Sequence, residues 1–170
     1  MKKNLYSGYI LKKNFPDQKS VSIFTDQLFQ FIFPLVENEE TFLLDQEKKA
    51  NDLKLLLKSL IQTCLADCEE DNNLIINTFF NYLSATAEML VKDAQFILDY
   101  DPAAKTLEEI ILSYPGFYAI AIYRLPHILY EQNISILPRM MSEQAHSKTG
   151  VDINAGAKIG FPFLLIMARE

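Results

Sequence analysis

Apolar residues recur at three- and four-residue steps through most of the chain, a spacing that predicts helices rather than strands. Three stretches carry the pattern most clearly, residues 20–34, 41–68 and 74–98. In each, the apolar residues fall on one side of the predicted helix, as they do in a helical bundle. The stripes comprise Val21, Phe24, Leu28 and Phe31; Leu53, Leu57, Leu60, Cys64 and Cys68; and Ile76, Phe79, Leu83, Leu90 and Ile97.

Polar residues and prolines predict where these helices begin and end. Ser20 is expected to cap the first helix, which should end at Pro34. The polar run at 69–73 is expected to separate the second helix from the third. Asp101 followed by Pro102 predicts the start of a fourth helix, with the aspartate as N-cap and the proline at the first helical position.

Two more helices are expected after Pro115. The sequence YPG at 114–116 should end the fourth helix, and a fifth should run toward Asn133 with Pro126 inside it. A sixth helix, within residues 134–150, should end at Gly150, because glycine tolerates the left-handed backbone that closes many helices.

From Val151 the pattern changes. In VDINAGAKIG, Ile153 and Ile159 lie six residues apart with small residues between them, a spacing typical of a left-handed parallel β-helix. The predicted fold is therefore mainly α. It has a helical-bundle domain at residues 1–148, followed at 149–170 by the first rung of a truncated left-handed parallel β-helix.

Charge and composition narrow the classes of function. The formal net charge is −6, and the lysine pairs are scattered, which argues against a nucleic-acid partner. The N-terminus lacks the long apolar segment of a signal peptide, and no apolar run was expected to reach the length of a membrane span. We therefore expect a cytoplasmic protein with neither a nucleic-acid nor a membrane partner.

The cysteines and histidines are expected to be structural. Cys64 and Cys68 lie one helical turn apart, but a closed zinc site needs four ligands, so no metal site is predicted. His127 follows Arg124 by three residues on one predicted helical face, which favours a structural or interface pair. His146 stands near a helix C-terminus, where an imidazolium suits the helix dipole.

Several motifs occur in an order that resembles the serine O-acetyltransferases. They are DPAA at 101–104, YPGFYAIAIYR at 114–124, His127, AHSKTG at 145–150, VDI at 151–153 and GAKIG at 156–160. The resemblance implies transfer of an acetyl group from acetyl-CoA to L-serine, giving O-acetylserine for cysteine biosynthesis. It also implies a helical domain before a left-handed β-helix, and trimers paired into hexamers through the helical domains.

The same resemblance assigns site residues. Asp101 matches an aspartate that contacts the amino-acid substrate, and Pro102 lies beside it. Asp152 matches the carboxylate that orients the catalytic histidine and stabilises its protonated form. Without the resemblance, Asp101 would be explained as a helix cap and Asp152 as a turn residue. Asn154 replaces a histidine that is common in the family motif.

The family pattern continues after the motif IG with FFIDHGTG, whose histidine is the general base. This chain has FLLIMARE instead, with Ile166 and Met167 where the Asp-His pair would fall. Codons for FFIDHGTG, read one nucleotide later, can encode Phe-Leu-Leu-Ile-Met-Ala-Arg and begin a Glu codon. We therefore expect a one-base frameshift from about residue 161, either a genuine lesion or a sequencing error. The apolar tail is then expected to be frayed or to be buried against another subunit.

The expected function is that of a serine O-acetyltransferase whose 170 residues are inactive alone, since they lack the base and the acetyl-CoA site. No cofactor is expected to bind this chain, and acetyl-CoA is the co-substrate of the intact enzyme. The alternative is a non-catalytic interaction module that joins full-length subunits. Implied partners are further copies of the chain, L-serine and O-acetylserine sulfhydrylase. A third interpretation is an unrelated all-helical protein.

Overall fold

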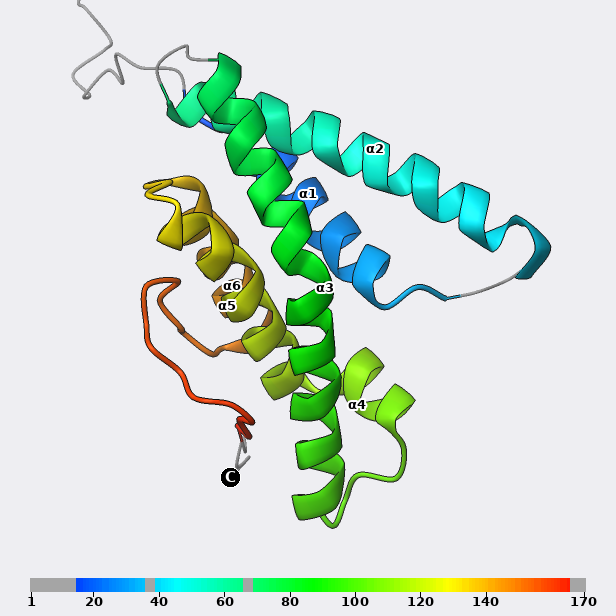
Figure 1. The fold of residues 1–170 in the computed structure, drawn as a ribbon. Helices are drawn as coiled ribbons and strands as arrows, with labels where there is room; N and C mark the ends of the chain where they lie inside the picture. The colour runs from blue at the N-terminus through cyan, green and yellow to red at the C-terminus, as the bar shows by residue number, and fades with distance from the viewer. Residues whose placement is uncertain (1–14, 36–38, 66–68, 166–170) are drawn as a thin grey trace, which may run out of the picture.

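The computed structural model describes residues 15–35, 39–65 and 69–165. These residues form six helices, and most of the chain is α-helical, as predicted (Figure 1). The helices are α1 (Gln18–Ile32), α2 (Glu39–Cys64), α3 (Glu69–Tyr100), α4 (Leu107–Ser113), α5 (Pro115–Glu131) and α6 (Leu137–Thr149).

The long helix α3 runs through the middle of the molecule and contacts two groups of helices (Figure 1). Its first half packs with α1, α2, α6 and the end of α5 around one apolar cluster. Its second half packs with α4 and the first turns of α5 around another. The segment after α6 lies against this second cluster, so α3 and α5 together form the surface on which the chain's last described residues rest.

The predicted apolar stripes are confirmed as core. Val21, Phe24 and Leu28 of α1 are buried, and Phe31 is half-buried. The leucines of the α2 stripe and all five members of the α3 stripe are also buried. Cys64 is half-buried, and Cys68 lies outside the described residues.

Two predicted boundaries in the first half are wrong. Asp17, not Ser20, caps α1, because its carboxylate accepts a hydrogen bond from the Ser20 backbone N–H at 2.9 Å. The polar run at 69–73 does not separate α2 from α3, since α3 begins at Glu69. An acidic sequence is compatible with the first turn of a helix, where the helix dipole favours negative charge.

The predicted helix start at Asp101 and Pro102 is also wrong. These residues form a turn, in which Asp101 Oδ1 accepts from the Ala103 N–H at 2.9 Å. Helix α4 begins later, because the Thr106 hydroxyl accepts from the Glu109 N–H at 3.1 Å and so caps it. Threonine is a good N-cap, and its acceptor falls at the position that the helix needs.

The later helices follow the prediction more closely. Pro115 begins α5 directly after the break at Tyr114, and Pro126 lies inside the helix. Gly150 ends α6 with a φ of 75°, and its N–H donates to the His146 carbonyl at 2.8 Å.

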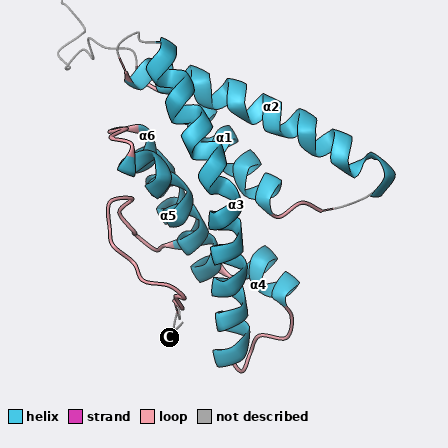
Figure 2. Cartoon of the chain, viewed as in Figure 1, coloured by secondary structure: helices cyan, strands magenta, loops and turns pink. Residues whose placement is uncertain are grey.

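Residues 150–165 contain no β-strand in the structure, so the first rung of a β-helix is not seen there (Figure 2). The segment runs as loop and turn along the helical body. A coil of a β-helix pairs its backbone with neighbouring coils, and no such neighbour is present among the described residues. The division at residues 148 and 149 stays a prediction.

The described part of the apolar tail, residues 161–165, differs from the predicted frayed state, and its burial against another subunit stays a prediction. Phe163 and Leu164 pack against the second apolar cluster, whereas Phe161 is 43% exposed. The residues from Ile166 onward, including those at the expected Asp-His positions, lie outside the described part.

The prediction that no apolar run reaches the length of a membrane span is wrong for one described helix. Within α3, Asp71–Tyr100 could cross a membrane by length and composition alone. A mostly buried core helix of a soluble protein passes the same test; in α3, 28% of the tested window is buried, and these side chains contribute to both apolar clusters. That the protein has no membrane partner stays a prediction.

Candidate functional site

Asp101 and Pro102, the predicted substrate residues, lie in the turn between α3 and α4. Asp101 is half-buried and Pro102 is exposed. The backbone fixes the Asp101 carboxylate, since one of its oxygens accepts from the Ala103 N–H. Desolvation raises the pKa of the nearby Tyr114 phenol, and the charge of Asp101 and a hydrogen bond to it raise this pKa further. The turn therefore presents a carboxylate beside a phenol that stays protonated at neutral pH.

Asp152, the predicted orienting carboxylate, lies just after α6 in a different neighbourhood. Its side chain is 57% exposed, and its Oδ1 is 3.9 Å from Arg139 Nη1 on α6. Arg139 also forms an ion pair with Glu143 one helical turn away. The structure therefore places Asp152 beside α6 and Asp101 at the far end of α3, in separate parts of the described chain.

A buried ion pair joins α3 to α5 beside the last described segment. Arg124 Nε donates to Asp93 Oδ2 at 2.6 Å, and Arg124 Nη2 donates to Asp93 Oδ1 at 3.1 Å. The side chains are 6% and 0% exposed. Nη2 of Arg124 also donates to the Gly160 carbonyl at 3.0 Å, and the Phe163 N–H donates to Asp93 Oδ1 at 2.8 Å. The pair therefore contacts the backbone on both sides of Phe161 and Pro162.

His127 and Tyr123, one turn apart on α5, contact the same segment. His127 Nδ1 donates to the Ala155 carbonyl at 2.6 Å, which requires the proton on Nδ1 because a carbonyl only accepts. The Tyr123 hydroxyl donates to the Ala157 carbonyl at 2.6 Å and accepts from the Ile159 N–H at 3.2 Å. Arg124 and His127 therefore both have the predicted structural contacts, but through this segment rather than as a pair with each other.

A groove of about 560 Å³ opens beside these contacts, between α3, α5 and the segment after α6. Its polar lining includes Tyr123, His127, Glu131 and Lys158. His127 Nε2 is 3.7 Å from Glu131 Oε1, which is beyond hydrogen-bond distance, so Nδ1 carries the hydrogen bond that fixes the imidazole. Among the residues described here, no group of three or more His, Cys, Asp or Glu side chains could hold a metal ion. That the chain binds no metal stays a prediction.

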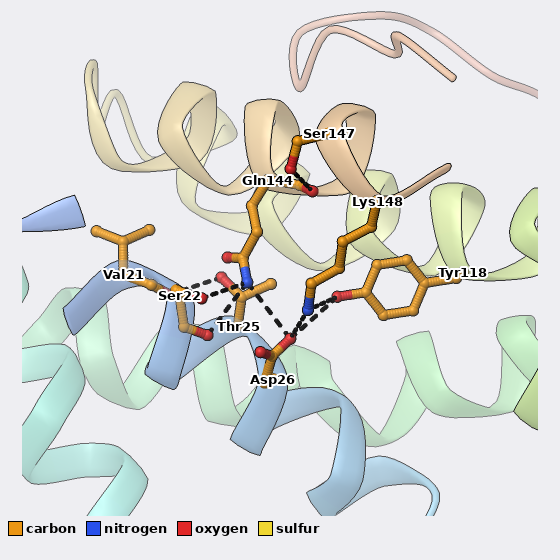
Figure 3. A network of polar contacts seen from close by, with 8 residues as sticks. All are labelled: Val21, Ser22, Thr25, Asp26, Tyr118, Gln144, Ser147 and Lys148. Atoms are coloured by element: carbon orange, nitrogen blue, oxygen red, sulfur yellow. Dashed lines mark hydrogen bonds and ion pairs between the residues drawn. The ribbon is translucent and has the colours of Figure 1, made fainter. Parts of the chain in front are cut away.

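A second polar cluster joins α1, α5 and α6 (Figure 3). Lys148 Nζ donates to Asp26 Oδ1 at 2.5 Å, and the Tyr118 hydroxyl donates to the same oxygen at 3.1 Å. Gln144 Nε2 donates to the Ser22 hydroxyl at 2.8 Å. Each side chain here is bonded to others within the cluster, which therefore fastens three helices together.

The sequence analysis did not predict the roles of Asp93 and Tyr123. It also did not predict the polar cluster of Ser22, Asp26, Tyr118, Gln144 and Lys148, called the Asp26 cluster below. Asp93 is 31 residues from Arg124, and nothing in local spacing links them. The presence of an aspartate on the apolar face of a predicted helix was the available signal, since a buried carboxylate needs a partner.

Comparison with known proteins finds relatives that match about half of the chain. No protein-family model matches it. Residues of the chain are 41% identical over 71 positions to a serine acetyltransferase of Synechococcus elongatus, covering 42% of this chain and 29% of that protein. A plasmid-borne serine acetyltransferase of the same organism is 37% identical over 91 residues, 54% of this chain and 28% of its own length. The serine acetyltransferase of Bacillus licheniformis is 40% identical over 78 residues, 46% of this chain and 36% of the relative.

Solved structures support the fold. Serine acetyltransferase isoform 3 of Entamoeba histolytica, solved in complex with cysteine, superposes with a TM-score of 0.73 at 23% identity. The comparison covers 92% of this chain and 54% of that one. Serine acetyltransferase 1 of the same organism gives a TM-score of 0.72 at 24% identity, with 92% and 56% covered. The chain thus matches roughly a third or less of its curated relatives' length, and about half of each solved chain. It is a homologue of the serine acetyltransferases that spans part of their length.

Proposed function

We propose that the protein derives from, or forms part of, a serine O-acetyltransferase, which moves an acetyl group from acetyl-CoA to the hydroxyl of L-serine. The observation that carries the proposal is the 37–41% identity to three serine acetyltransferases. The motifs from Asp101 to Gly160 supply the residue-level support. Cysteine biosynthesis in the cytoplasm is the implied setting.

The chemistry needs a base, because a serine hydroxyl is a poor nucleophile near neutral pH. In this proposal Asp101 holds the substrate in register, with Pro102 shaping the turn beside it, and positioning of this kind contributes to the rate. Asp152 orients the histidine base and stabilises the imidazolium that forms when the base takes the hydroxyl proton. Asp101 follows α3 and Asp152 follows α6, and each has its own local partners, so in this proposal a second subunit completes the site in which both act.

The 170 residues by themselves are proposed to be inactive. The resemblance places the Asp-His pair at Ile166 and Met167, so this sequence carries no histidine at the position of the base. The acetyl-CoA groove of the intact enzyme would be built by later coils. Residues 151–160 would then have a neighbouring coil stacked on them.

A second candidate function is an interaction module that joins full-length subunits. Several large apolar side chains on α2 and α3 are exposed: Leu43 78%, Leu44 70%, Leu55 67%, Leu74 66% and Tyr82 60%. Contact with further copies, as trimers or hexamers, would cover apolar surface of this kind. Binding of O-acetylserine sulfhydrylase is proposed only for the intact enzyme.

The test begins with the DNA that follows the Gly160 codon, read in all three frames. An Asp-His codon pair and hexapeptide repeats in the adjacent frame are expected, and the protein encoded by that frame should acetylate L-serine. In that protein Asp101→Asn should raise the KM for serine at least tenfold, because the amide loses the charge that faces the substrate amino group. Asp99→Asn is the matched control, since Asp99 is exposed at the end of α3 and bonds to Gln95.

Two results would contradict the proposal. Unrelated sequence in every frame would contradict the proposed acetyltransferase activity. The interaction module would then be the remaining candidate function. Acetyl transfer by the 170-residue chain itself would show that its chemistry does not need the missing histidine.

A further inference from the structure

The segment 155–163 has its backbone bound by side chains instead of by a neighbouring strand. Five of its backbone groups contact four side chains of α3 and α5, which we call the backbone cradle. The cradle residues are Asp93, Tyr123, Arg124 and His127, and the backbone groups are the carbonyls of Ala155, Ala157 and Gly160 and the N–H groups of Ile159 and Phe163.

The cradle distinguishes backbone donors from backbone acceptors, and it determines which residue of the segment each side chain contacts. Arg124 and His127 offer only donors to the carbonyls they contact, and Asp93 offers only an acceptor to the Phe163 N–H. The Tyr123 hydroxyl does both, as it donates to one carbonyl and accepts from an N–H two residues later. Shifting the segment by one residue would place groups of the wrong kind opposite these partners.

The cradle is also rigid. Three of its side chains are almost fully buried: Asp93 is 0% exposed, Tyr123 3% and Arg124 6%. Asp93 and Arg124 are also joined by two hydrogen bonds. Buried charges that are paired and fully hydrogen-bonded keep a fixed geometry, because any rearrangement would leave one of them uncompensated. The segment therefore rests on groups that are already held in place by α3 and α5.

The segment also lies close to the helices. The backbone at Gly156 passes so near the Tyr130 ring that an added Cβ would lie 2.5 Å from Cζ. Ile153, Ala157 and Ile159 pack on the second apolar cluster on the other side. Apolar contacts attach the segment to the helices, and the cradle determines which residue of the segment lies opposite each side chain.

We propose that the backbone cradle is a register-setting dock, which orders residues 155–163 on the helical body with no second coil present. It would thereby fix the direction that the chain takes after Gly160, where it leaves the surface formed by α3 and α5. If the proposed function holds, these four side chains are positioning residues for the histidine base that follows in the intact enzyme, and this clause alone rests on that function. The dock itself is a property of the 170-residue chain.

Hydrogen exchange of backbone amides in the 170-residue chain tests the dock without any assay of activity. Tyr123→Phe keeps the ring in the core and removes the hydroxyl that bonds to Ala157 and Ile159. The Ile159 amide should then exchange about tenfold faster, because its acceptor is lost. Amides of α1, α2 and α6 serve as the internal reference, and their exchange should not change.

Tyr118→Phe is the matched control, because Tyr118 lies on the same helix and its hydroxyl bonds to Asp26 instead of to the segment. It should leave Ile159 exchange as in the parent chain. Unchanged exchange of Ile159 in Tyr123→Phe would overturn the proposal. So would an equal acceleration of every helix, or the same effect from Tyr118→Phe, since either would show only a general loss of stability. Because no catalysis is measured, these results stand whether or not the protein proves to be an acetyltransferase.

Discussion

Arg124 on α5 and Asp93 on α3 form a buried, two-point ion pair that also bonds to the backbone of Gly160 and Phe163. One interaction therefore joins two helices and the segment after α6. Removing one partner leaves the other as an isolated charge in the interior, which costs far more than the pair itself contributes.

Asp93→Ala is expected to lower the free energy of unfolding by about 3–5 kcal/mol, because the Arg124 guanidinium would lose its counter-charge. Urea unfolding followed by circular dichroism measures this change. The double variant Asp93→Leu with Arg124→Met should recover most of the loss, since neither charge then remains buried. A loss below about 1 kcal/mol in the single variant would mean that water reaches the pair.

Gly116 on α5 and Gly156 in the C-terminal segment both lie where the two parts come close, and they predict opposite sensitivities. A Cβ at Gly116 would meet the Leu165 carbonyl oxygen at 2.6 Å, whereas a Cβ at Gly156 would meet the outer atoms of the Tyr130 ring. Backbone cannot move aside easily, but Tyr130 is 46% exposed and its ring can turn. Gly116→Ala should therefore displace residues 163–165, and Gly156→Ala should change little.

Limited chymotrypsin digestion with mass spectrometry checks this pair of variants. Gly116→Ala should speed cleavage at Phe163 several-fold, because the added Cβ would displace the Leu165 backbone. Equal cleavage in both variants would show that Leu165 does not rest on α5.

The start of α4 gives a third prediction. Thr106→Ala should cost about 1 kcal/mol by removing the N-cap, which lowers Tm by about 2–4 °C in a chain of this size. Thr106→Ser keeps the acceptor oxygen and should restore most of the loss. Thermal unfolding of Asp101→Ala provides the comparison, and a larger effect there than at Thr106 would return the capping role to Asp101.

The sequence predicted the helices well because a stripe of apolar side chains is a local signal. Spacing alone predicts a buried helix face for Leu53 and Leu57, and likewise for Ile76 and Phe79. Caps were harder to predict, because Asp17 competes with Ser20 and Thr106 competes with Asp101 within a few residues. Local preference allows each of them, and the tertiary position of the helix decides.

The contacts of the C-terminal segment could not be predicted from spacing. Asp93 precedes Arg124 by 31 residues, and Tyr123 meets Ile159 across 36. The pattern of Ile153 and Ile159 indicated which side chains face inward, and both pack on the second apolar cluster, although no rung is formed. It did not predict that side chains of α3 and α5 would take the place of a neighbouring coil.

The Asp26 cluster predicts a loss of stability at alkaline pH. Desolvation alone would lower the pKa of Lys148, but its hydrogen bond to Asp26 and the nearby Tyr118 raise it overall above 10.5. Burial and the Asp26 charge raise the pKa of Tyr118 above 10.0. A group whose pKa is higher in the folded state stabilises fully below its unfolded pKa, and this contribution disappears as the pH rises through the folded pKa.

Tm is therefore expected to fall as the pH rises above about 10, where Tyr118 and then Lys148 lose their protons. Tyr118→Phe should make this fall shallower, because the folded protein then no longer holds one of the two protons. Tyr82→Phe is the control, since Tyr82 is 60% exposed on α3 and stands outside the cluster. Differential scanning calorimetry across this range measures both variants. An equally steep fall of Tm in Tyr118→Phe would show that alkaline unfolding begins elsewhere and that the Asp26 cluster does not control it.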